Sequence, residues 1–172
     1  MMKEIMNNDQ VNKMLKRITH EIIERNQALD QVVLVGILKK GFPIALLLQE
    51  NLKKFADIDI PTYAIDIRGY RDDTKEYLGN SPFEDGQVVD IANKTVVIVD
   101  DVLFTGRSVR ATMDALLDYG RPDKIQLAVL VDRGHRELPI RADYIGKNLP
   151  TSKSEKIVVN TEDLSIYLDE FN

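Results

Sequence analysis

Apolar positions along the chain follow two periodicities, one typical of helices and one typical of buried strands. Val11, Leu15, Ile18 and Ile22 recur at helical spacing, which predicts an amphipathic helix over residues 9–28 or so. Asn7, Asn8 or Asp9 would cap this helix. Largely apolar runs predict buried strands at residues 32–37, 96–99 and 125–131. Weaker patterns predict a strand at 60–68, helices at 42–55 and 107–119, and a short final helix at 161–170.

The alternation of these elements predicts an α/β domain whose mainly parallel central sheet is flanked by helices. Residues 70–90 are polar, turn-rich and aperiodic. A segment of that length inside a compact domain is usually a mobile loop or a lid over a functional site. No repeat or linker divides the chain, so we expect a single domain over residues 1–172.

Composition removes several classes of function. The chain has 172 residues, 44% hydrophobic and 30% charged, as in ordinary globular proteins. It has no cysteine, which excludes a disulfide framework and a thiol nucleophile, and only two histidines, His20 and His135, which argues against a histidine metal centre. No apolar run has membrane-spanning length, and the first residues lack the apolar core of a signal peptide. We therefore expect a cytoplasmic protein with no membrane partner.

Charge is unevenly distributed. The formal net charge of −5 argues against a generic nucleic-acid coat, and we expect no DNA partner. Residues 133–156 nevertheless hold six basic side chains against three acidic ones. This region is a candidate basic patch.

The most informative segment is residues 96–108, an apolar strand followed by Asp100, Asp101 and a loop that opens a helix. Unpaired amides at a helix start bind anions, and Thr105 and Ser108 add hydroxyl donors around Gly106. Paired carboxylates accept hydrogen bonds from vicinal hydroxyls. A phosphorylated ribose needs both groups, and such ligands bind at the carboxyl ends of strands in open α/β sheets.

Residues 96–108 also allow an interpretation without a ligand, in which the two aspartates are solvated at the end of a strand and the loop is an ordinary helix cap. Gly36 and Gly41 have the spacing of a P-loop, but Phe42 and Pro43 follow where lysine and a hydroxyl residue are required. The chain also contains no dinucleotide-binding glycine motif.

Residues 96–108 resemble the phosphoribosyl-pyrophosphate (PRPP) signature of the type I phosphoribosyltransferases. Within that superfamily, the chain resembles the bacterial pyr-operon attenuation regulators, which bind RNA and are also uracil phosphoribosyltransferases. The segments that carry this second likeness are residues 17–26, 70–73, 100–108 and 125–156. The resemblance implies the type I phosphoribosyltransferase fold with a mobile loop over the active site.

The resemblance also implies an active site that converts uracil and PRPP to UMP and pyrophosphate. Asp100, Asp101 and Arg71 would be catalytic, the last in a segment that closes over PRPP. Mg²⁺ would arrive mainly with PRPP rather than on a protein ligand set. The residues implied to bind PRPP or UMP are Lys39, Lys40, Gly41, Val102, Leu103, Phe104, Thr105, Gly106, Arg107, Ser108, Asp132, Arg133 and Ile145. Relatives commonly carry Thr-Arg-Gly where this chain has Lys39-Lys40-Gly41.

A second implied function is recognition of pyr leader mRNA when UMP or UTP occupies the site. Lys13, Lys16, Arg17 and His20 form one polar stripe, which by itself is more often a solvated face. The residues matching the RNA surface are Lys16, Arg17, His20, Arg25, Arg136, Arg141 and Lys147. The resemblance further implies a homodimer or homotetramer. Two alternatives stay open: a salvage enzyme for another base such as hypoxanthine, and an RNA regulator with weak catalysis.

Overall fold

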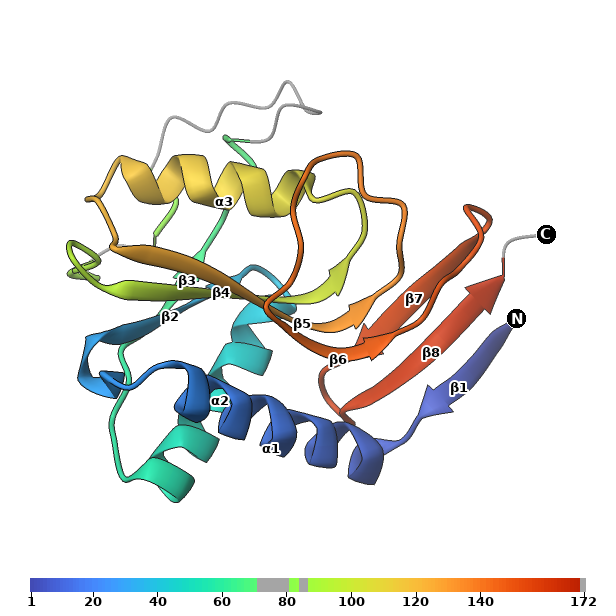
Figure 1. Cartoon of the computed structure of the whole chain (residues 1–172). Coiled ribbons are helices and arrows are strands. Elements are labelled where there is room, and N and C mark those ends of the chain that lie inside the picture. The colour runs from blue at the N-terminus through green and yellow to red at the C-terminus, as the bar shows by residue number, and fades with distance from the viewer. Residues whose placement is uncertain (71–80, 84–86, 171–172) are drawn as a thin grey trace.

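The computed structural model describes residues 1–70, 81–83 and 87–170 (Figure 1). Its elements follow one another in the order below. They are β1 (Met2–Met6), α1 (Asn8–Arg25), a 3₁₀ turn (Leu29–Gln31), β2 (Val32–Ile37), α2 (Gly41–Ala56), β3 (Thr62–Ile65), β4 (Thr95–Leu103), α3 (Arg107–Leu117), β5 (Lys124–Asp132), β6 (Tyr144–Asn148), β7 (Glu155–Asn160) and β8 (Ser165–Glu170).

A five-stranded parallel sheet in the order β3-β2-β4-β5-β6 forms the centre of the molecule. Helix α3 covers one face, and α1 and α2 cover the other (Figure 1). Because both faces are covered, the inner strands are apolar on both sides, and all six residues of β2 are buried. The predicted α/β architecture is confirmed. Its strand order brings the carboxyl ends of β2, β4 and β5 to one edge.

Side chains from β4 serve both hydrophobic layers. Val97 and Val99 belong to the cluster that packs with α1 and α2, whereas Val96 and Ile98 belong to the cluster that packs with α3. This division follows from the alternation of side chains across a strand. The strand therefore holds the two halves of the fold together directly beneath its functional end.

Helix α1 begins as its sequence predicts. Asn7 Oδ1 accepts from the Gln10 amide at 3.0 Å, and Gln10 Oε1 accepts from the Asn7 amide at 2.9 Å, so the two residues form a capping box. The helix ends at Arg25, short of the predicted limit, because Asn26 adopts an extended conformation. The other two long helices, predicted at 42–55 and 107–119, are observed as α2 and α3.

The helix predicted at residues 161–170 is wrong. Residues 165–170 form β8, the central strand of an antiparallel sheet in the order β1-β8-β7. Ile166 and Leu168 stand on the same side of β8 and pack into the cluster beneath the main sheet. Strand pairing on both edges overrides the helical preference of the acidic end of this segment. Strands β1, β6 and β7 were also not foreseen.

The region between β3 and β4 differs from its prediction. The strand expected at 60–68 is limited to Thr62–Ile65. Beyond it, Phe83 forms an isolated antiparallel bridge with Ile65. The mobile loop expected within residues 70–90 falls largely on residues 71–80 and 84–86, which lie outside the described residues. In the described part of the chain, no helix combines the length and the apolar character needed to cross a bilayer.

Candidate active site

Three hollows open along the carboxyl ends of the central strands. We call them the loop hollow, of about 200 Å³ around residues 102–109, the lysine hollow, of about 310 Å³ around Lys39 and Lys40, and the wide pocket, of about 510 Å³ around Asp132 and Ile145. Asp100, Val102 and Ser108 line both the loop hollow and the lysine hollow. Leu103 lines both the loop hollow and the wide pocket. The three hollows therefore form one row, with the end of β4 at its centre.

The loop hollow lies where β4 turns into α3. Gly106 precedes the helix with a φ of 93°, a conformation that disfavours side chains with a Cβ. The Arg107 amide donates to Thr105 Oγ1 at 3.3 Å, so the threonine hydroxyl faces the start of the helix. Val102, Leu103, Phe104 and Ser108 complete the wall. The predicted anion-binding turn therefore has the expected strand-loop-helix geometry.

Asp100 and Asp101 lie inside β4 rather than after it, which corrects the predicted end of the strand. Pairing with β5 continues through Asp100 and Val102 to Leu103. Each carboxylate accepts from the next backbone amide at 2.8 Å, Asp100 Oδ1 from Asp101 and Asp101 Oδ1 from Val102. Both side chains line the lysine hollow, and Asp100 also lines the loop hollow. Two half-buried carboxylates thus border the hollows on either side of the strand end.

The lysine hollow is formed where β2 passes into α2. The peptide bond between Leu38 and Lys39 is cis, and Lys39 and Lys40 are exposed at the rim. A Cβ on Gly41 would lie 2.4 Å from the Val99 carbonyl oxygen, so only glycine lets α2 start this close to β4. That close approach places two lysines opposite the carboxylates of β4.

Arg68, which the sequence did not indicate, also lines the lysine hollow. Its Nη2 lies 2.7 Å from Asp66 Oδ2. Hydrogen bonding to Arg68 holds the pKa of Asp66 below its usual value, and the charge of Lys39 adds to this effect. The Asp66 carboxylate is therefore charged at neutral pH.

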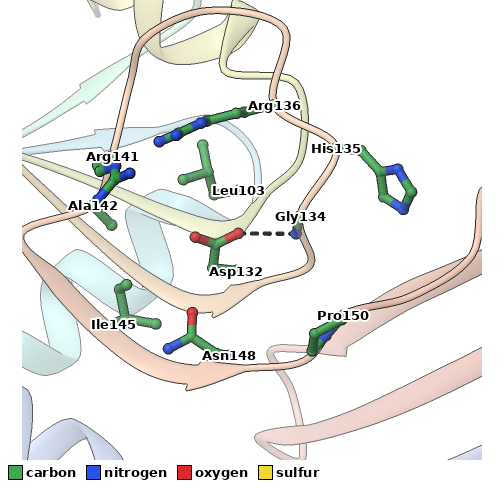
Figure 2. A pocket seen from close by; sticks show the side chains of 10 residues that line it. All are labelled: Leu103, Asp132, Gly134, His135, Arg136, Arg141, Ala142, Ile145, Asn148 and Pro150. Atoms are coloured by element: carbon green, nitrogen blue, oxygen red, sulfur yellow. Dashed lines mark hydrogen bonds between the residues drawn. The ribbon is translucent and has the colours of Figure 1, made fainter.

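The wide pocket lies over the ends of β5 and β6 (Figure 2). Asp132, paired with Asn148 across the two strands, accepts a hydrogen bond from the Gly134 amide at 3.0 Å. Asp132 and Ile145, both predicted, therefore lie in one pocket. Asn148 was missed because β6 was not recognised as a strand. If β6 had been predicted as a strand, Asn148 would have been grouped with Asp132, because ligands bind at the carboxyl ends of neighbouring parallel strands.

Arg133, also predicted to bind substrate, is not among the residues that line the wide pocket. It is buried, and its guanidinium donates to Thr151 Oγ1 at 2.8 Å and to the carbonyl oxygens of Ser152 and Glu155 at 3.1 and 2.5 Å. Burial lowers the pKa of Arg133. The same guanidinium stacks 4.1 Å from the ring centre of Phe104. Arg133 therefore reaches the loop hollow through Phe104.

The predicted RNA residues of α1 lie on its exposed surface. Lys16 is exposed, and His20 packs its ring against Phe55 at 4.8 Å. Arg17 pairs with Glu21 at 2.5 Å, and its Nη2 donates to the Ile145 carbonyl oxygen at 3.1 Å. The hydrogen bond from Arg17 to the Ile145 carbonyl joins α1 to β6, the strand that carries Ile145.

The remaining predicted RNA residues divide between two places. Arg25 forms an ion pair with Asp143 at 3.1 Å, and Lys147 is exposed on β6. Arg136 and Arg141 instead line the wide pocket, where Figure 2 shows Arg136 extending toward Arg141. The predicted RNA residues are therefore divided between an exposed surface and a pocket. Arg71 lies outside the described residues.

This geometry is that of a nucleotide-handling α/β protein, and comparison with known families identifies the class. The model of the phosphoribosyl transferase domain family matches residues 1–165. The chain therefore belongs to the phosphoribosyltransferase family.

Its relatives place it more narrowly. Proteins named bifunctional protein PyrR are 53% identical in Enterococcus faecalis over 161 residues, covering 94% of this chain and 90% of the relative. The Haemophilus influenzae protein is 51% identical over 166 residues, covering 94% and 93%. The Clostridium perfringens protein is 49% identical over 161 residues, covering 93% and 90%. Within the family, the chain is a member of the PyrR group.

Solved structures confirm the fold. A hypoxanthine phosphoribosyltransferase from Staphylococcus aureus superposes with a TM-score of 0.73 at 20% identity, covering 95% of this chain and 90% of that one. A hypoxanthine phosphoribosyltransferase from Trypanosoma cruzi also gives 0.73 at 20% identity, covering 95% and 89%. At this identity the likeness concerns the fold alone. The type I phosphoribosyltransferase fold predicted for the chain is therefore confirmed.

Proposed function

We propose that this protein transfers the phosphoribosyl group of PRPP to uracil, forming UMP and pyrophosphate, and that it binds pyr leader mRNA to promote transcription attenuation. The observation that carries the proposal is the row of three connected hollows at the end of β4, in a chain of the PyrR group. Each hollow offers groups complementary to one part of the substrates. Substrates and nascent transcript both belong to the cytoplasm, where we expect the protein to act.

The loop hollow is the proposed site of the 5′-phosphate. Amides at the start of α3 carry no intrahelical partner, and the helix dipole adds partial positive charge there. Thr105 and Ser108 supply hydroxyl donors. Arg107, the first residue of α3, is not among the residues that line the hollow and supplies a cation beside it. Val102, Leu103 and Phe104 form the wall against the phosphate and the adjoining ribose.

Asp100 and Asp101 are the proposed partners of the ribose hydroxyls. As pyrophosphate leaves, positive charge develops on the anomeric carbon, and carboxylates held nearby stabilise it. Their hydrogen bonds to backbone amides fix their orientation beforehand. In the proposal, Arg71 acts in the closed site, where exclusion of water prevents hydrolysis of PRPP.

The lysine hollow is the proposed site of pyrophosphate. Lys39 and Lys40 supply positive charge, and Gly41 lets their loop lie against β4. Among the described residues, no group of three or more acidic or histidine side chains gathers to hold a metal ion. Asp100 and Asp101 suit an ion that arrives already bound to phosphate oxygens, and Mg²⁺, when bound, neutralises charge on the leaving group.

The wide pocket is the proposed site of uracil. Asp132 and Ile145 lie at its centre, with the donors of Arg136 and Arg141 and the amide of Asn148 around them. On the side away from N1, the atom that becomes bonded to ribose, uracil presents two carbonyl oxygens with the N3–H group between them. A pocket that combines donors with a carboxylate and an amide can satisfy all three groups. Arg133 supports the neighbouring loop hollow through Phe104.

The proposed RNA surface runs from α1 across β6. Sequence-specific RNA recognition targets unpaired bases while basic side chains bind the phosphates. Lys16, Arg17, His20, Arg25 and Lys147 lie on these elements, and Arg136 and Arg141 extend the surface to the wide pocket. UMP or UTP in the site would favour the RNA-binding state by its differential affinity for that state. Assembly into a homodimer or homotetramer would widen the surface.

Turnover of radiolabelled uracil with PRPP and Mg²⁺ tests the enzymatic half of the proposal. UMP formation is expected, with hypoxanthine as the control base. Turnover of hypoxanthine but not uracil would favour a salvage enzyme for purines. This alternative is considered because the chain shares its fold, at low sequence identity, with a hypoxanthine phosphoribosyltransferase.

Titration of pyr leader RNA with and without UMP tests the regulatory half. Tighter binding in the presence of UMP is expected, with a scrambled RNA of the same length as the control. Equal affinity for both RNAs would remove the regulatory claim. Nucleotide-dependent RNA binding without uracil turnover would identify a regulator with weak catalysis, which is the alternative that the lysines at 39 and 40 keep open.

A further inference from the structure

Residues 134–142 form an irregular segment that leaves β5, passes beside the start of α3 and returns to β6 (Figure 1). The Glu137 amide donates to the Thr105 carbonyl oxygen at 2.9 Å. A Cβ on Gly106 would lie 3.5 Å from Ile140 and 3.7 Å from Leu138 side-chain atoms. The segment therefore lies beside the loop hollow and is joined to it by this hydrogen bond.

One charged contact joins this segment to the loop hollow. Arg107 Nε donates to Glu137 Oε1 at 3.0 Å. The Arg107 side chain is 29% exposed and that of Glu137 is 54% exposed. The carboxylate of Glu137 thus neutralises part of the positive charge of Arg107, which lies in the chain between Gly106 and Ser108, two residues that line the loop hollow.

The same short segment reaches the neighbouring site. Arg136 and Arg141, on either side of Glu137 in the chain, line the wide pocket together with Asp132 (Figure 2). One segment borders the sites proposed for the phosphate and for the base.

We propose that Glu137 is a positioning residue that competes with the ligand phosphate for Arg107 and so weakens the hold on phosphorylated ligands. The proposal rests on the proposed function and specifies how one of its subsites is regulated. A phosphate dianion entering the loop hollow meets Arg107 already paired. It must displace the carboxylate or bind against its charge. Glu137 therefore acts on ligands that carry a phosphate and not on the base or nucleoside alone.

The variant Glu137→Gln removes the charge while keeping the length of the side chain and an oxygen acceptor for Arg107. We expect UMP to bind roughly two- to fivefold more tightly, the range of a partly exposed ion pair, while uridine binding is unchanged. In turnover, the KM for PRPP falls by a similar factor and the KM for uracil does not. The gain shrinks as salt is added, since it comes from a screened charge. Glu162→Gln, an exposed glutamate in the turn before β8, is the matched control and leaves all these quantities unchanged.

A double-mutant cycle with Arg107→Gln shows whether Glu137 acts through this arginine. The effect of Glu137→Gln on UMP binding should vanish in that background. Unchanged or weaker UMP binding by Glu137→Gln, or an equal effect on uridine, overturns the inference. If the wild-type protein neither converts uracil nor binds UMP, the proposed function fails. In that case, titration of wild type and Glu137→Gln with inorganic phosphate still tests the inference. Tighter phosphate binding by the variant supports it, and unchanged or weaker binding overturns it.

Discussion

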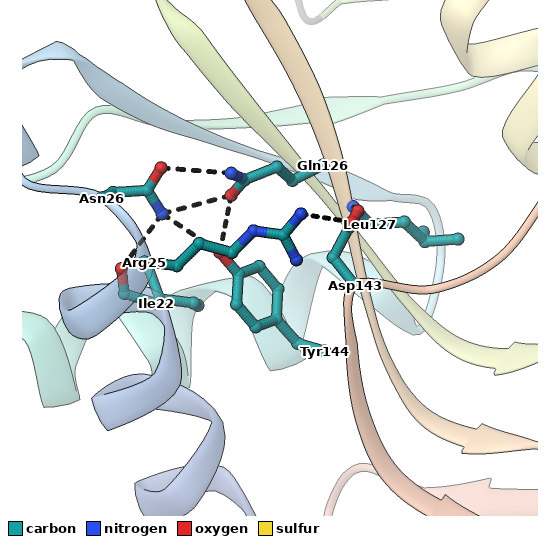
Figure 3. A network of polar contacts seen from close by, with 7 residues as sticks. All are labelled: Ile22, Arg25, Asn26, Gln126, Leu127, Asp143 and Tyr144. Atoms are coloured by element: carbon teal, nitrogen blue, oxygen red, sulfur yellow. Dashed lines mark hydrogen bonds and ion pairs between the residues drawn. The ribbon is translucent and has the colours of Figure 1, made fainter.

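Asn26, just after α1, and Gln126, in β5, exchange two hydrogen bonds in the buried interior (Figure 3). Asn26 Nδ2 donates to Gln126 Oε1 at 3.1 Å, and Gln126 Nε2 donates to Asn26 Oδ1 at 3.2 Å. The Tyr144 hydroxyl donates to the same Gln126 Oε1 at 2.7 Å. The end of α1 is therefore joined to β5 and β6, the strands whose carboxyl ends carry Asp132 and Asn148.

Replacing Asn26 by alanine should lower the free energy of unfolding by roughly 1–3 kcal/mol, because the buried Nε2 group of Gln126 loses its acceptor and the Tyr144 hydroxyl loses one of its two partners. Urea denaturation followed by circular dichroism measures the change. Gln27→Ala, at the exposed neighbouring position, is the matched control and should stay within about 0.5 kcal/mol of wild type. Equal stability of the two variants would contradict a structural role for the network.

Tyr144 makes the stability of the protein depend on alkaline pH. Burial raises the pKa of Tyr144, against smaller opposing effects of Asn26 and the charge of Arg25. Below the ordinary tyrosine pKa of about 10, the residue is protonated in both states and contributes no pH dependence. Above it, the unfolded chain ionises first, so the free energy of unfolding falls as the pH rises toward the folded pKa.

The variant Tyr144→Phe isolates this effect. At pH 8 it should be less stable than wild type, since the hydrogen bond to Gln126 is lost. Above about pH 10 the difference should narrow, because only the wild-type protein loses stability through this ionisation. Urea denaturation at a series of pH values measures the gap. A gap that stays constant from pH 8 to the highest pH would show that Tyr144 ionises alike in both states.

The parts of the fold that were predictable from the sequence are those in which local pattern and tertiary environment agree. The apolar run of β2 fits only a strand covered on both faces, and Asn7 with Gln10 has the composition of a capping box. The turn at Gly106 was predictable for the same reason, since a strand, a glycine turn and a helix follow one another without a gap.

The missed elements depend on distant partners. Strand β8 pairs with the adjacent β7, and it becomes the central strand of its sheet because β1, at the other end of the chain, pairs Met2 with Asp169. In β6, a Cβ on Gly146 would lie 2.4 Å from the Leu130 carbonyl oxygen and 2.5 Å from Met14 Sδ, so a residue that weakens strand propensity is required by packing. No local pattern contains this information.

In the candidate site, too, contiguous residues were predictable and residues brought together by the fold were not. Asp100 and the loop at 105–108 were predictable because they are contiguous in the sequence. The approach of Arg136 and Arg141 to Asp132 depends on the path of residues 134–142, for which the sequence has no periodic signal. The buried position of Arg133 likewise depends on Thr151 and its neighbours, which approach only in the folded chain.

Arg133 should stabilise both the fold and the phosphate site. Arg133→Met keeps the apolar length of the side chain but removes its hydrogen bonds to Thr151, Ser152 and Glu155. We expect a loss of roughly 2–3 kcal/mol in urea denaturation and a higher KM for PRPP, because Phe104 loses the group that stacks on it. Arg121→Met, at an exposed position, is the control. An Arg133→Met protein as stable as this control would contradict the assignment.

Lys147 and Arg141 should have separable roles, although both belong to the proposed RNA surface. Lys147 is exposed on β6 and is not among the residues that line the wide pocket. Lys147→Gln should weaken binding to pyr leader RNA at low salt, reduce the slope of log affinity against log salt by about one, and leave the KM for uracil unchanged. Lys124→Gln, at the opposite end of β5, is the control for lost positive charge and should change neither quantity.

Arg141→Gln should act on both functions, because its guanidinium lines the wide pocket with Asp132 and Ile145. Loss of a hydrogen bond from a charged donor should raise the KM for uracil by about tenfold, in addition to weakening RNA binding. Steady-state turnover and RNA titration on the same preparation measure the two effects. If Arg141→Gln weakens RNA binding with an unchanged KM for uracil, Arg141 faces RNA alone, and the wide pocket reads the base without it.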